Sequence, residues 1–134
     1  MFDRHANRQQ LYRNAGIPVH ESPDDLSAFD AVIEATGDPG ALQQIIANSR
    51  PGCTLLLLGL PYARHDFTFE HIVAFDKSVI GSVGSSADEF REAIALLPSL
   101  DFEPLTKAVF PLERFDEAWA TFRRREHLKI LLQP

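Results

Sequence analysis

The sequence predicts an α/β protein, a partial Rossmann-like (doubly wound) parallel sheet with helices on its faces. Short apolar runs alternate along the chain with segments of helical period, which is the order typical of βαβ units. Because helices separate most of the predicted strands, most of the sheet is expected to be parallel. The length of 134 residues is close to one domain, so residues 1–134 are expected to form a single unit.

The N-terminal half contains two predicted helices and three predicted strands. Asp3 is placed to cap the first helix, and Gly16 suits the left-handed exit from it. Asp38 is the predicted N-cap of the second helix, with Pro39 in its first turn. The predicted helices cover residues 4–15 and 39–49, and the predicted strands cover residues 17–19, 30–36 and 53–58. The last of these strands is almost continuously apolar, which is typical of burial on both faces.

The C-terminal half begins with residues 66–75, where Phe67 and Phe69 alternate as in a short strand but leave the assignment open. Ser86 and Glu89 have the spacing of a capping box, which predicts a helix that runs to a break near Pro98. Strands are predicted at residues 78–83, 106–110 and 128–132, and a helix at residues 112–124. That helix carries an apolar stripe formed by Leu112, Phe115, Trp119 and Phe122.

Composition excludes several classes of protein. The net charge is −6, which argues against nucleic-acid binding, because such binding needs clustered cations. Residues 123–125 are three arginines followed by Glu126, and we interpret them as a solvated helix end. The longest leucine run, residues 55–58, is far shorter than the roughly 20 residues of a membrane span. The first residues lack the apolar stretch of a secretory signal, so a cytoplasmic location without a membrane partner is predicted.

Side chains that commonly carry chemistry are sparse. Cys53 is the single cysteine, which excludes an internal disulfide and a cysteine-based zinc cluster. It opens a predicted buried strand, so an inert core thiol is favoured over a nucleophile. Glu34 lies inside a predicted strand, and it either faces a solvated or ligand-facing edge or pairs with an arginine, a structural role being favoured. The histidines are scattered in sequence, and exposed or partly packed side chains are favoured over a zinc site that could still assemble in space: His5, His20, His65, His71 and His127.

Glycine-bearing turns follow three of the predicted strands, at residues 35–37, 58–60 and 83–85. In an open parallel sheet, ligands bind beyond the carboxyl ends of the strands, and glycine there lets a ligand approach the backbone closely. The alternative is that each glycine serves only the dihedral angles of a tight turn. One such turn would favour that alternative, whereas three at equivalent positions make the two interpretations about equal.

These segments resemble a known family. Residues 32–37, and residues 50–54 leading to residues 58–61, look like the second half of the nucleotide-binding domain of zinc-type medium-chain alcohol dehydrogenases. Residues 80–85, the helix that begins near residue 88 and residues 110–112 resemble the C-terminus of the same family. The Gly-Ser-Val segment before an acidic and aromatic helix is similar to the glucose-dehydrogenase branch. The resemblance covers nearly all of the chain.

The resemblance implies an NAD or NADP cofactor and a set of residues that contact it. Asp3 matches the acid that accepts hydrogen bonds from the adenosine ribose, which favours NAD, whereas Arg4 beside it could instead hold a 2′-phosphate. One turn matches the segment against the adenosine half of the cofactor: Ala35, Thr36 and Gly37. Two further segments match those that hold the nicotinamide ribose and carboxamide: Leu58, Gly59 and Leu60, and Ser82, Val83 and Gly84.

Two parts of the family are not matched here, namely the catalytic domain with its zinc ligands and the strand with the GxGxxG turn. The resemblance therefore implies the C-terminal nucleotide-binding portion of an NAD(P)-dependent alcohol or sugar dehydrogenase, inactive alone, with no catalytic residue or metal ligand of its own. The alternatives are a non-catalytic dimerisation or nucleotide-binding module and, less favoured, an unrelated α/β regulatory domain. Residues 104–134 match a tail that packs on the catalytic domain. Because residues 128–132 would leave apolar side chains exposed, the chain is expected to dimerise or exchange segments, with residues 78–83 as a ready interface.

Overall fold

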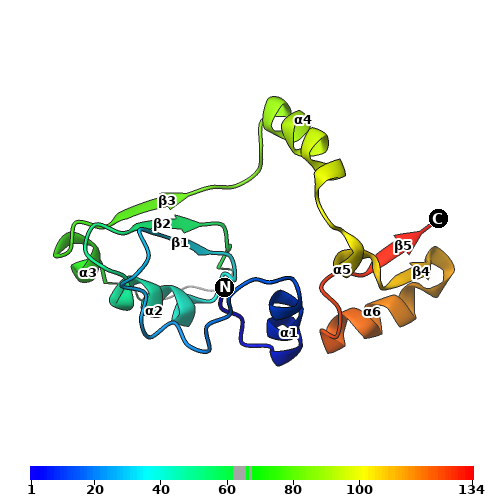
Figure 1. Ribbon diagram of the computed structural model, residues 1–134, viewed down its shortest axis with the longest axis horizontal. Helices are drawn as coiled ribbons and strands as arrows, with labels where there is room; N and C mark the ends of the chain where they lie inside the picture. The colour runs from blue at the N-terminus through cyan, green and yellow to red at the C-terminus, as the bar shows by residue number, and fades with distance from the viewer. Residues whose placement is uncertain (62–65, 67) are drawn as a thin grey trace. The chain divides into compact units, whose positions relative to one another are not determined.

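The structure is a computed structural model that describes residues 1–61, 66 and 68–134 (Figure 1). The chain divides into two compact units, which are described separately. We call Ser22–Ser85 the sheet unit, and we call Met1–Glu21 together with Ser86–Pro134 the terminal unit. In the described part of the chain, no helix is both long enough and apolar enough to cross a bilayer.

The sheet unit contains one parallel sheet of three strands in the order β1-β2-β3. Its elements are β1 (Ala31–Glu34), α2 (Pro39–Asn48), β2 (Thr54–Leu57), α3 (Glu70–Val73) and β3 (Ser78–Gly81). The register aligns Glu34 with Leu57 and Leu57 with Gly81. The prediction of a parallel α/β sheet is thus confirmed, and all three strands end at the same edge.

The core of the sheet unit lies between the sheet and its helices, which cover one face of it (Figure 1). It consists of Ile45, Ile46, Cys53 and Leu55, and Cys53 and Leu55 are fully buried. The opposite face carries Ile33, Leu56 and Ile80 in register, of which Ile33 is 60% and Ile80 51% exposed. The expectation that the leucine-rich strand is buried on both faces is therefore wrong for the described chain, because both helices lie on one side.

Local signals explain where α2 begins. The Asp38 side chain accepts a hydrogen bond from the Ala41 amide at 3.0 Å, and Pro39 occupies the first turn. Proline costs nothing there because the first amides of a helix have no intrahelical acceptor. Both predictions for this helix start are confirmed.

The C-terminal end of α2 is closed by a buried lysine. Lys77 is 7% exposed, and its Nζ donates to the carbonyl oxygens of Ile46 at 2.5 Å and Ser49 at 2.7 Å, and to the Ser49 hydroxyl at 3.0 Å. The ammonium group thereby satisfies carbonyls that the helix leaves unpaired, at the end where the helix dipole favours a cation. Burial lowers the pKa of Lys77, an effect that the nearby Cys53 partly opposes.

The strands of the sheet unit are shorter than predicted, because each ladder stops where the chain turns out of the sheet. The open assignment of residues 66–75 is resolved as the short helix α3 for part of its length, with Phe69 immediately before it. Phe67, which suggested a strand there, lies outside the described residues.

The terminal unit contains a second, two-stranded parallel sheet, β4-β5. Its elements are α1 (Ala6–Asn14), α4 (Ala87–Leu96), η1 (Leu97–Ser99), α5 (Glu103–Thr106), β4 (Val109–Pro111), η2 (Leu112–Arg114), α6 (Phe115–Arg124) and β5 (Leu131–Gln133). Helix α6 contacts β4 and β5 and contributes the buried Ala118 and Thr121. The capping box at Ser86 and Glu89 is confirmed, since both reciprocal hydrogen bonds are present.

Two predictions about the N-terminal segment are wrong. Residues 17–19 form no strand, because Pro18 has no amide to donate and the Ile17 amide closes the end of α1 by donating to Tyr12. Asp3 does not cap α1, whose N-cap position is His5; instead its carboxylate accepts the His5 amide at 2.9 Å. The left-handed exit at Gly16 is confirmed by a φ of +72°.

Other corrections fall near the C-terminus. The strand predicted at residues 106–110 starts only at Val109, because α5 occupies residues up to Thr106 and the Asp101 carboxylate accepts the Glu103 amide at its start. The last strand is shifted toward the end of the chain and is paired with β4. Helix α6 ends as predicted, with Arg125 in the left-handed region and the arginine run exposed.

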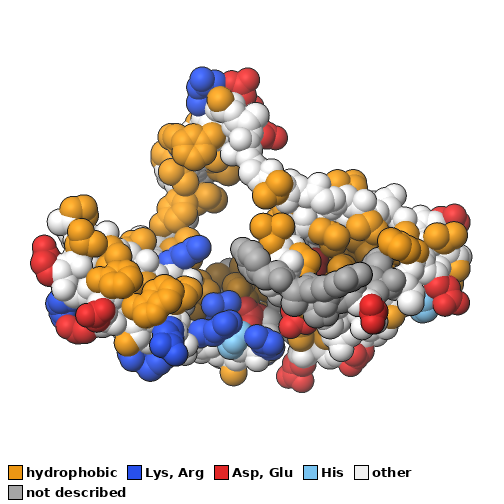
Figure 2. Space-filling model, turned by 180° about the vertical axis from the view of Figure 1, so that it is seen from behind, with side chains coloured by type: hydrophobic (Ala, Val, Ile, Leu, Met, Phe, Trp, Pro, Cys, Tyr) orange, Lys and Arg blue, Asp and Glu red, His pale blue; other side chains and the backbone are white. Residues whose placement is uncertain are grey.

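The apolar stripe of α6 is a half-exposed aromatic ladder. Trp119 stacks between Phe115, at a centroid distance of 6.2 Å, and Phe122, at 5.4 Å. Each of the three side chains is about half exposed, and Figure 2 shows hydrophobic side chains gathered at the surface of the terminal unit. The stripe therefore faces outward in this chain.

Candidate functional site

The carboxyl ends of the three parallel strands bring together most of the predicted ligand-contacting residues. We call residues 35–37, 58–60 and 82–84 the rim. The Leu58 amide donates to the Glu34 carbonyl at 2.8 Å, and the Ser82 amide donates to the Leu57 carbonyl at 3.0 Å. Each rim segment is thus anchored to its neighbour by hydrogen bonds that continue the sheet, and the three segments leave from one edge.

The first two rim segments are in direct backbone contact. A Cβ built on Gly59 would lie 2.1 Å from the Gly37 amide nitrogen, and one built on Gly37 would lie 2.6 Å from the Leu60 carbonyl oxygen. Gly37 also has a φ of +68°, a conformation that glycine adopts without steric cost. Both glycines are therefore required by the packing of the turns against each other. The alternative that a rim glycine serves the dihedral angles of its own turn applies to Gly37, whereas Gly59 has no positive φ.

Glu34 lies immediately beneath this contact. It is 4% exposed, and its Oε1 accepts hydrogen bonds from the Thr36 amide at 2.6 Å, the Thr36 hydroxyl at 2.5 Å and the Gly37 amide at 3.1 Å. This supports the structural role favoured for Glu34. Within the described part of the chain, the donors to this carboxylate are neutral groups.

The third rim segment is more open than the other two. Val83 is 82% exposed, and Gly84 has a φ of +71° with free space around its built Cβ. Gly84 is therefore needed for its backbone conformation and not for close packing. This segment offers exposed backbone at the same sheet edge.

Asp3 and Arg4, the remaining two predicted site residues, belong to the terminal unit. The Asp3 carboxylate lies 2.9 Å from His5 Nδ1 and 3.7 Å from Arg8. Burial raises the pKa of Asp3, but the hydrogen bonds from His5 and the positive charge of Arg8 outweigh burial, so the pKa lies below its ordinary value. Asp3 is thus an ionised acceptor already engaged with two neighbours, while Arg4 is exposed.

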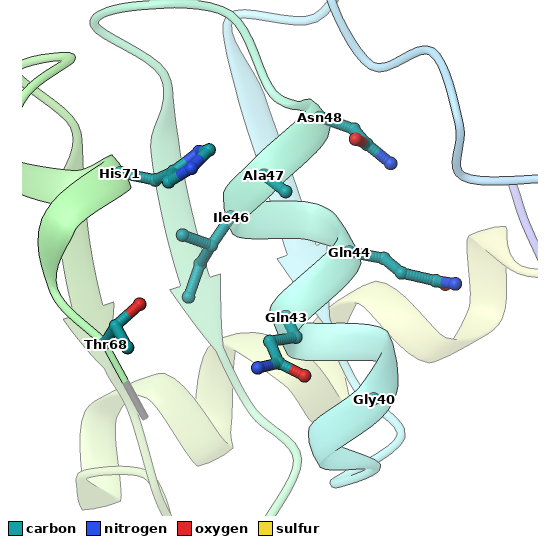
Figure 3. Close-up of a pocket in the computed structure, with 8 residues that line it drawn as sticks. All are labelled: Gly40, Gln43, Gln44, Ile46, Ala47, Asn48, Thr68 and His71. Atoms are coloured by element: carbon teal, nitrogen blue, oxygen red, sulfur yellow. The ribbon is translucent and has the colours of Figure 1, made fainter. Parts of the chain in front are cut away.

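Two hollows in the sheet unit were not anticipated from the sequence. One lies beside α2 and α3, and Figure 3 shows the His71 ring pointing from α3 toward α2. It is lined by Gly40, Gln43, Gln44, Ile46, Ala47, Asn48, Thr68 and His71. The other is apolar and is lined by Leu42, Ile46, Leu57, Phe69, Ile72 and Val79.

The described residues contain no cluster of three or more His, Cys, Asp or Glu side chains that could hold a metal ion. Zinc therefore does not fit the described residues of this chain. A dinucleotide fits the rim in its position, because ligands of open parallel sheets bind beyond the carboxyl ends of the strands. The Cβ positions of Gly37 and Gly59 face the neighbouring turn and open no space for it.

Solved structures share this fold. L-Idonate 5-dehydrogenase from Escherichia coli superposes with a TM-score of 0.80 at 19% identity, covering 94% of this chain and 39% of that one. Haloferax mediterranei glucose dehydrogenase in complex with NADP, Zn and gluconolactone gives a TM-score of 0.71 at 23% identity, covering 87% and 38%. At these identities the likeness establishes the fold.

Sequence relatives point to the same group of proteins. Glucose 1-dehydrogenase 1 of Haloterrigena turkmenica is 32% identical over 114 residues, which cover 77% of this chain and 30% of that protein. Sorbitol dehydrogenase of Macaca fascicularis is 32% identical over 106 residues, which cover 78% and 29%. The chain thus spans about a third of the length of these relatives. The family model described as glucose dehydrogenase C-terminus matches residues 10–133, and the chain belongs to that family.

Proposed function

We propose that this chain is the C-terminal nucleotide-binding portion of an NAD(P)-dependent alcohol or sugar dehydrogenase. The observation that carries the proposal is the rim, where three parallel strands end at one edge and Gly37 and Gly59 hold two turns in backbone contact. In open α/β sheets this edge is where ligands bind. Family membership supplies the reaction class, since the matched relatives bear the names of sugar and polyol dehydrogenases.

Each rim segment has a proposed role. Residues 35–37 contact the adenosine half of the dinucleotide, and residues 58–60 and 82–84 hold the nicotinamide ribose and carboxamide. Asp3 accepts from the adenosine ribose and favours NAD, while Arg4 offers a charge that would favour NADP. When bound, the dinucleotide supplies the hydride acceptor.

The chain alone is proposed to lack turnover. Among the described residues there is no cluster that could hold zinc, and the pyrophosphate cradle of the family, a glycine-rich turn at a helix N-terminus, has no counterpart in the sequence. Residues 104–134 are proposed to pack on a catalytic domain. The full 134-residue chain, incubated with zinc, NAD or NADP and either an alcohol or glucose, should form no reduced cofactor. Sustained zinc-dependent reduction would contradict this proposal.

The affinity of the chain for the cofactor distinguishes a chain that keeps a weak nucleotide site from one that has no such site. Calorimetric titration of the chain with NAD or NADP is expected to give a dissociation constant in the millimolar range or weaker, because the phosphates lack their cradle. Micromolar binding would mean that the chain holds the pyrophosphate by other means.

The second candidate function is a non-catalytic assembly module. Exposed apolar side chains favour it: Ile33 and Ile80 lie on the uncovered sheet face, and Val83 and Trp119 are at least half exposed. Monomeric proteins rarely leave large contiguous apolar patches in water. A homodimer or a segment-exchanged oligomer is proposed, with β3 as an interface.

A further inference from the structure

Helix α4 carries an exposed apolar stripe of its own, in addition to the aromatic ladder of α6. Phe90, Ile94 and Leu97 follow one another at i, i+4 and i+7, so they lie on one side of the helix. Phe90 is 61% and Ile94 52% exposed, and α4, which is described throughout, contributes no buried residue. The helix packs chiefly against η1, the turn that directly follows it. Its stripe is therefore an uncovered apolar face.

The aromatic ladder of α6 matches this stripe in spacing and in length. Phe115, Trp119 and Phe122 also stand at i, i+4 and i+7, and each of the two helices has 10 residues. Helix α6 is held in place by the buried Ala118 and Thr121 and by its contacts with β4 and β5, which leave the ladder exposed. Side chains of two such stripes interdigitate when the helices pack along their length, and aromatic residues are enriched in interfaces of this kind.

The charges at the helix ends decide the direction of such packing. Helix α4 begins with Asp88 and Glu89, and α6 ends in the arginine run of residues 123–125. An antiparallel arrangement places the acidic start of α4 beside this run. A parallel arrangement would place it beside Asp116 and Glu117 in the first turn of α6, where like charges repel. Charge complementarity therefore favours antiparallel packing.

Both of these helix ends keep hydrogen-bonding groups for a partner. The exposed side chains of Arg123 and Arg125 have no ion pair in the part of the chain that the structure describes. Asp88 pairs with Arg91, and Glu89 closes the capping box. A carboxylate has about four acceptor positions, so these local bonds leave room for a second donor. Hydrogen bonds between arginine and carboxylate are among the stronger ones in proteins.

We propose that α4 of one copy of this chain docks antiparallel on the aromatic ladder of α6 in a second copy. Phe90 then lies opposite Phe122, and Ile94 lies opposite Trp119. The contact is heterologous, because two different surfaces meet in it, and it is separate from the edge of β3. It goes beyond the proposed function, since a catalytic domain that packs on residues 104–134 would displace the second copy from the ladder.

Trp119 reports on this contact directly, because it is the single tryptophan of the chain. Its fluorescence should shift to shorter wavelength, along a saturable curve, as the concentration of the wild-type chain rises, because docking removes the indole from water. A spectrum that does not depend on concentration would overturn the proposal. This holds for a chain that associates only through β3, and also for a chain whose own α4 covers its ladder.

Ile94→Asp disables the docking helix. It places a carboxylate at the centre of the α4 stripe, and it should weaken the association that Trp119 reports at least ~10-fold, because docking would bury an unpaired charge. The matched control is Ala95→Asp, which puts the same side chain at the next, exposed position on the far side of the helix. The control should stay within about threefold of the wild type. Equal losses in the two variants would overturn the proposed face of α4.

A mixing experiment shows whether the docked helix comes from a second copy. Trp119→Phe keeps an apolar ladder and an intact α4 but removes the tryptophan signal. An excess of this chain should restore the shift of Trp119 in the Ile94→Asp chain, because its α4 docks on the intact α6 of that chain. A chain that carries both substitutions should not restore it. Failure of the Trp119→Phe chain to restore the shift, with both chains folded by circular dichroism, would overturn the proposal.

Charge reversal tests the direction of packing without changing α4. Arg123→Glu combined with Arg125→Glu should weaken the association at least ~10-fold at low salt, and less at high salt, because exposed charges are screened. Asp116→Lys reverses a charge at the other end of α6 and should stay within about threefold of the wild type. A larger effect of Asp116→Lys would indicate parallel packing and overturn the arrangement. All of these substitutions lie outside the rim, so calorimetric titration with NAD or NADP tests the proposed function separately.

Discussion

A Cβ built on Gly59 would lie 2.1 Å from the amide nitrogen of Gly37, a separation far inside van der Waals contact. The two residues follow different strands, β1 and β2, so their contact joins two turns of the sheet edge. The same built atom would lie 2.4 Å from Oε2 of Glu34. A side chain at position 59 would therefore separate the turns and disturb the buried carboxylate together.

Gly59→Ala is accordingly expected to destabilise the sheet unit by about 1–3 kcal/mol, the range found when atoms are forced into a well-packed site. Urea unfolding followed by circular dichroism measures the change. Gly81→Ala is the matched control, since it lies at the same sheet edge and its built Cβ has open space around it. It should change the free energy of unfolding by less than about 0.5 kcal/mol. Equal effects of the two variants would contradict the close contact at Gly59.

Lys77→Met is expected to destabilise the chain, because it removes the ammonium group that caps the C-terminal end of α2. The substitution keeps the length of the side chain but leaves the Ile46 and Ser49 carbonyls without the donor they now have. An unsatisfied buried polar group costs about 1–3 kcal/mol. Lys107→Met serves as control, because Lys107 is an exposed partner of Glu103 within α5 and its turn, and it should cost under about 0.5 kcal/mol. Urea unfolding of both variants checks the difference, and similar losses would show that Lys77 does not close the helix.

Asp3 should make the stability of the terminal unit depend on acid pH. Its pKa in the folded chain lies below the ordinary value of 3.8, so near pH 4 the unfolded chain binds more protons than the folded one. Stability from Asp3 is then fully present above that pH and is lost as the pH falls through the lowered pKa. The contribution is expected to be below about 1 kcal/mol, because the group is partly exposed to solvent.

Asp3→Asn should flatten this dependence. Urea midpoints measured between neutral pH and pH 3 should fall less steeply for the variant than for the wild type. Glu92→Gln, which removes an exposed carboxylate from α4, should retain the wild-type slope. An unchanged slope in the Asp3 variant would mean that His5 and Arg8 do not stabilise the carboxylate.

The elements with strong local signals could be predicted from the sequence. Asp38 with Pro39, and Ser86 with Glu89, fix helix starts through hydrogen bonds within a few residues, and these starts are confirmed. The strands of the sheet unit were placed correctly but predicted too long, because pairing ends where the chain turns out of the sheet, and the pattern of one strand does not show where its partner ends. Residues 17–19 failed because the apolar pattern ignored the missing amide of Pro18.

The candidate site was predictable only in part. Three glycine turns after strands indicate a common edge once the sheet is known to be parallel, and the register of Glu34, Leu57 and Gly81 bears out this arrangement of the strands. The direction of the Glu34 side chain could not be deduced, because a strand pattern does not show that the carboxylate turns back to accept from Thr36 and Gly37. Whether the rim binds a cofactor is a prediction that the experiments above address.

Self-association through β3 is the remaining prediction. The Ser78 amide donates to Cys53, which directly precedes β2, and the Ser82 amide donates to Leu57 in β2. Amides of a parallel strand alternate in direction, so those of Val79 and Gly81 point to the open edge of the sheet. An open edge of this kind can pair with a strand of a second copy. Val79→Pro removes one outward donor and is compatible with an edge strand. It should weaken dimerisation at least ~10-fold, or about 1.4 kcal/mol, in sedimentation equilibrium.

Val79→Thr provides the control for that change. Threonine has nearly the same shape and keeps the amide, so pairing through the backbone should survive, whereas an interface built on burial of the Val79 side chain would be weakened by the buried hydroxyl. Loss of the dimer in the proline variant alone therefore assigns the interface to the strand edge, and loss in both assigns it to the apolar hollow that Val79 lines. A wild-type chain that remains monomeric at high concentration would contradict the proposed self-association itself, because the exposed Ile80 and Val83 would then be tolerated in water without a partner.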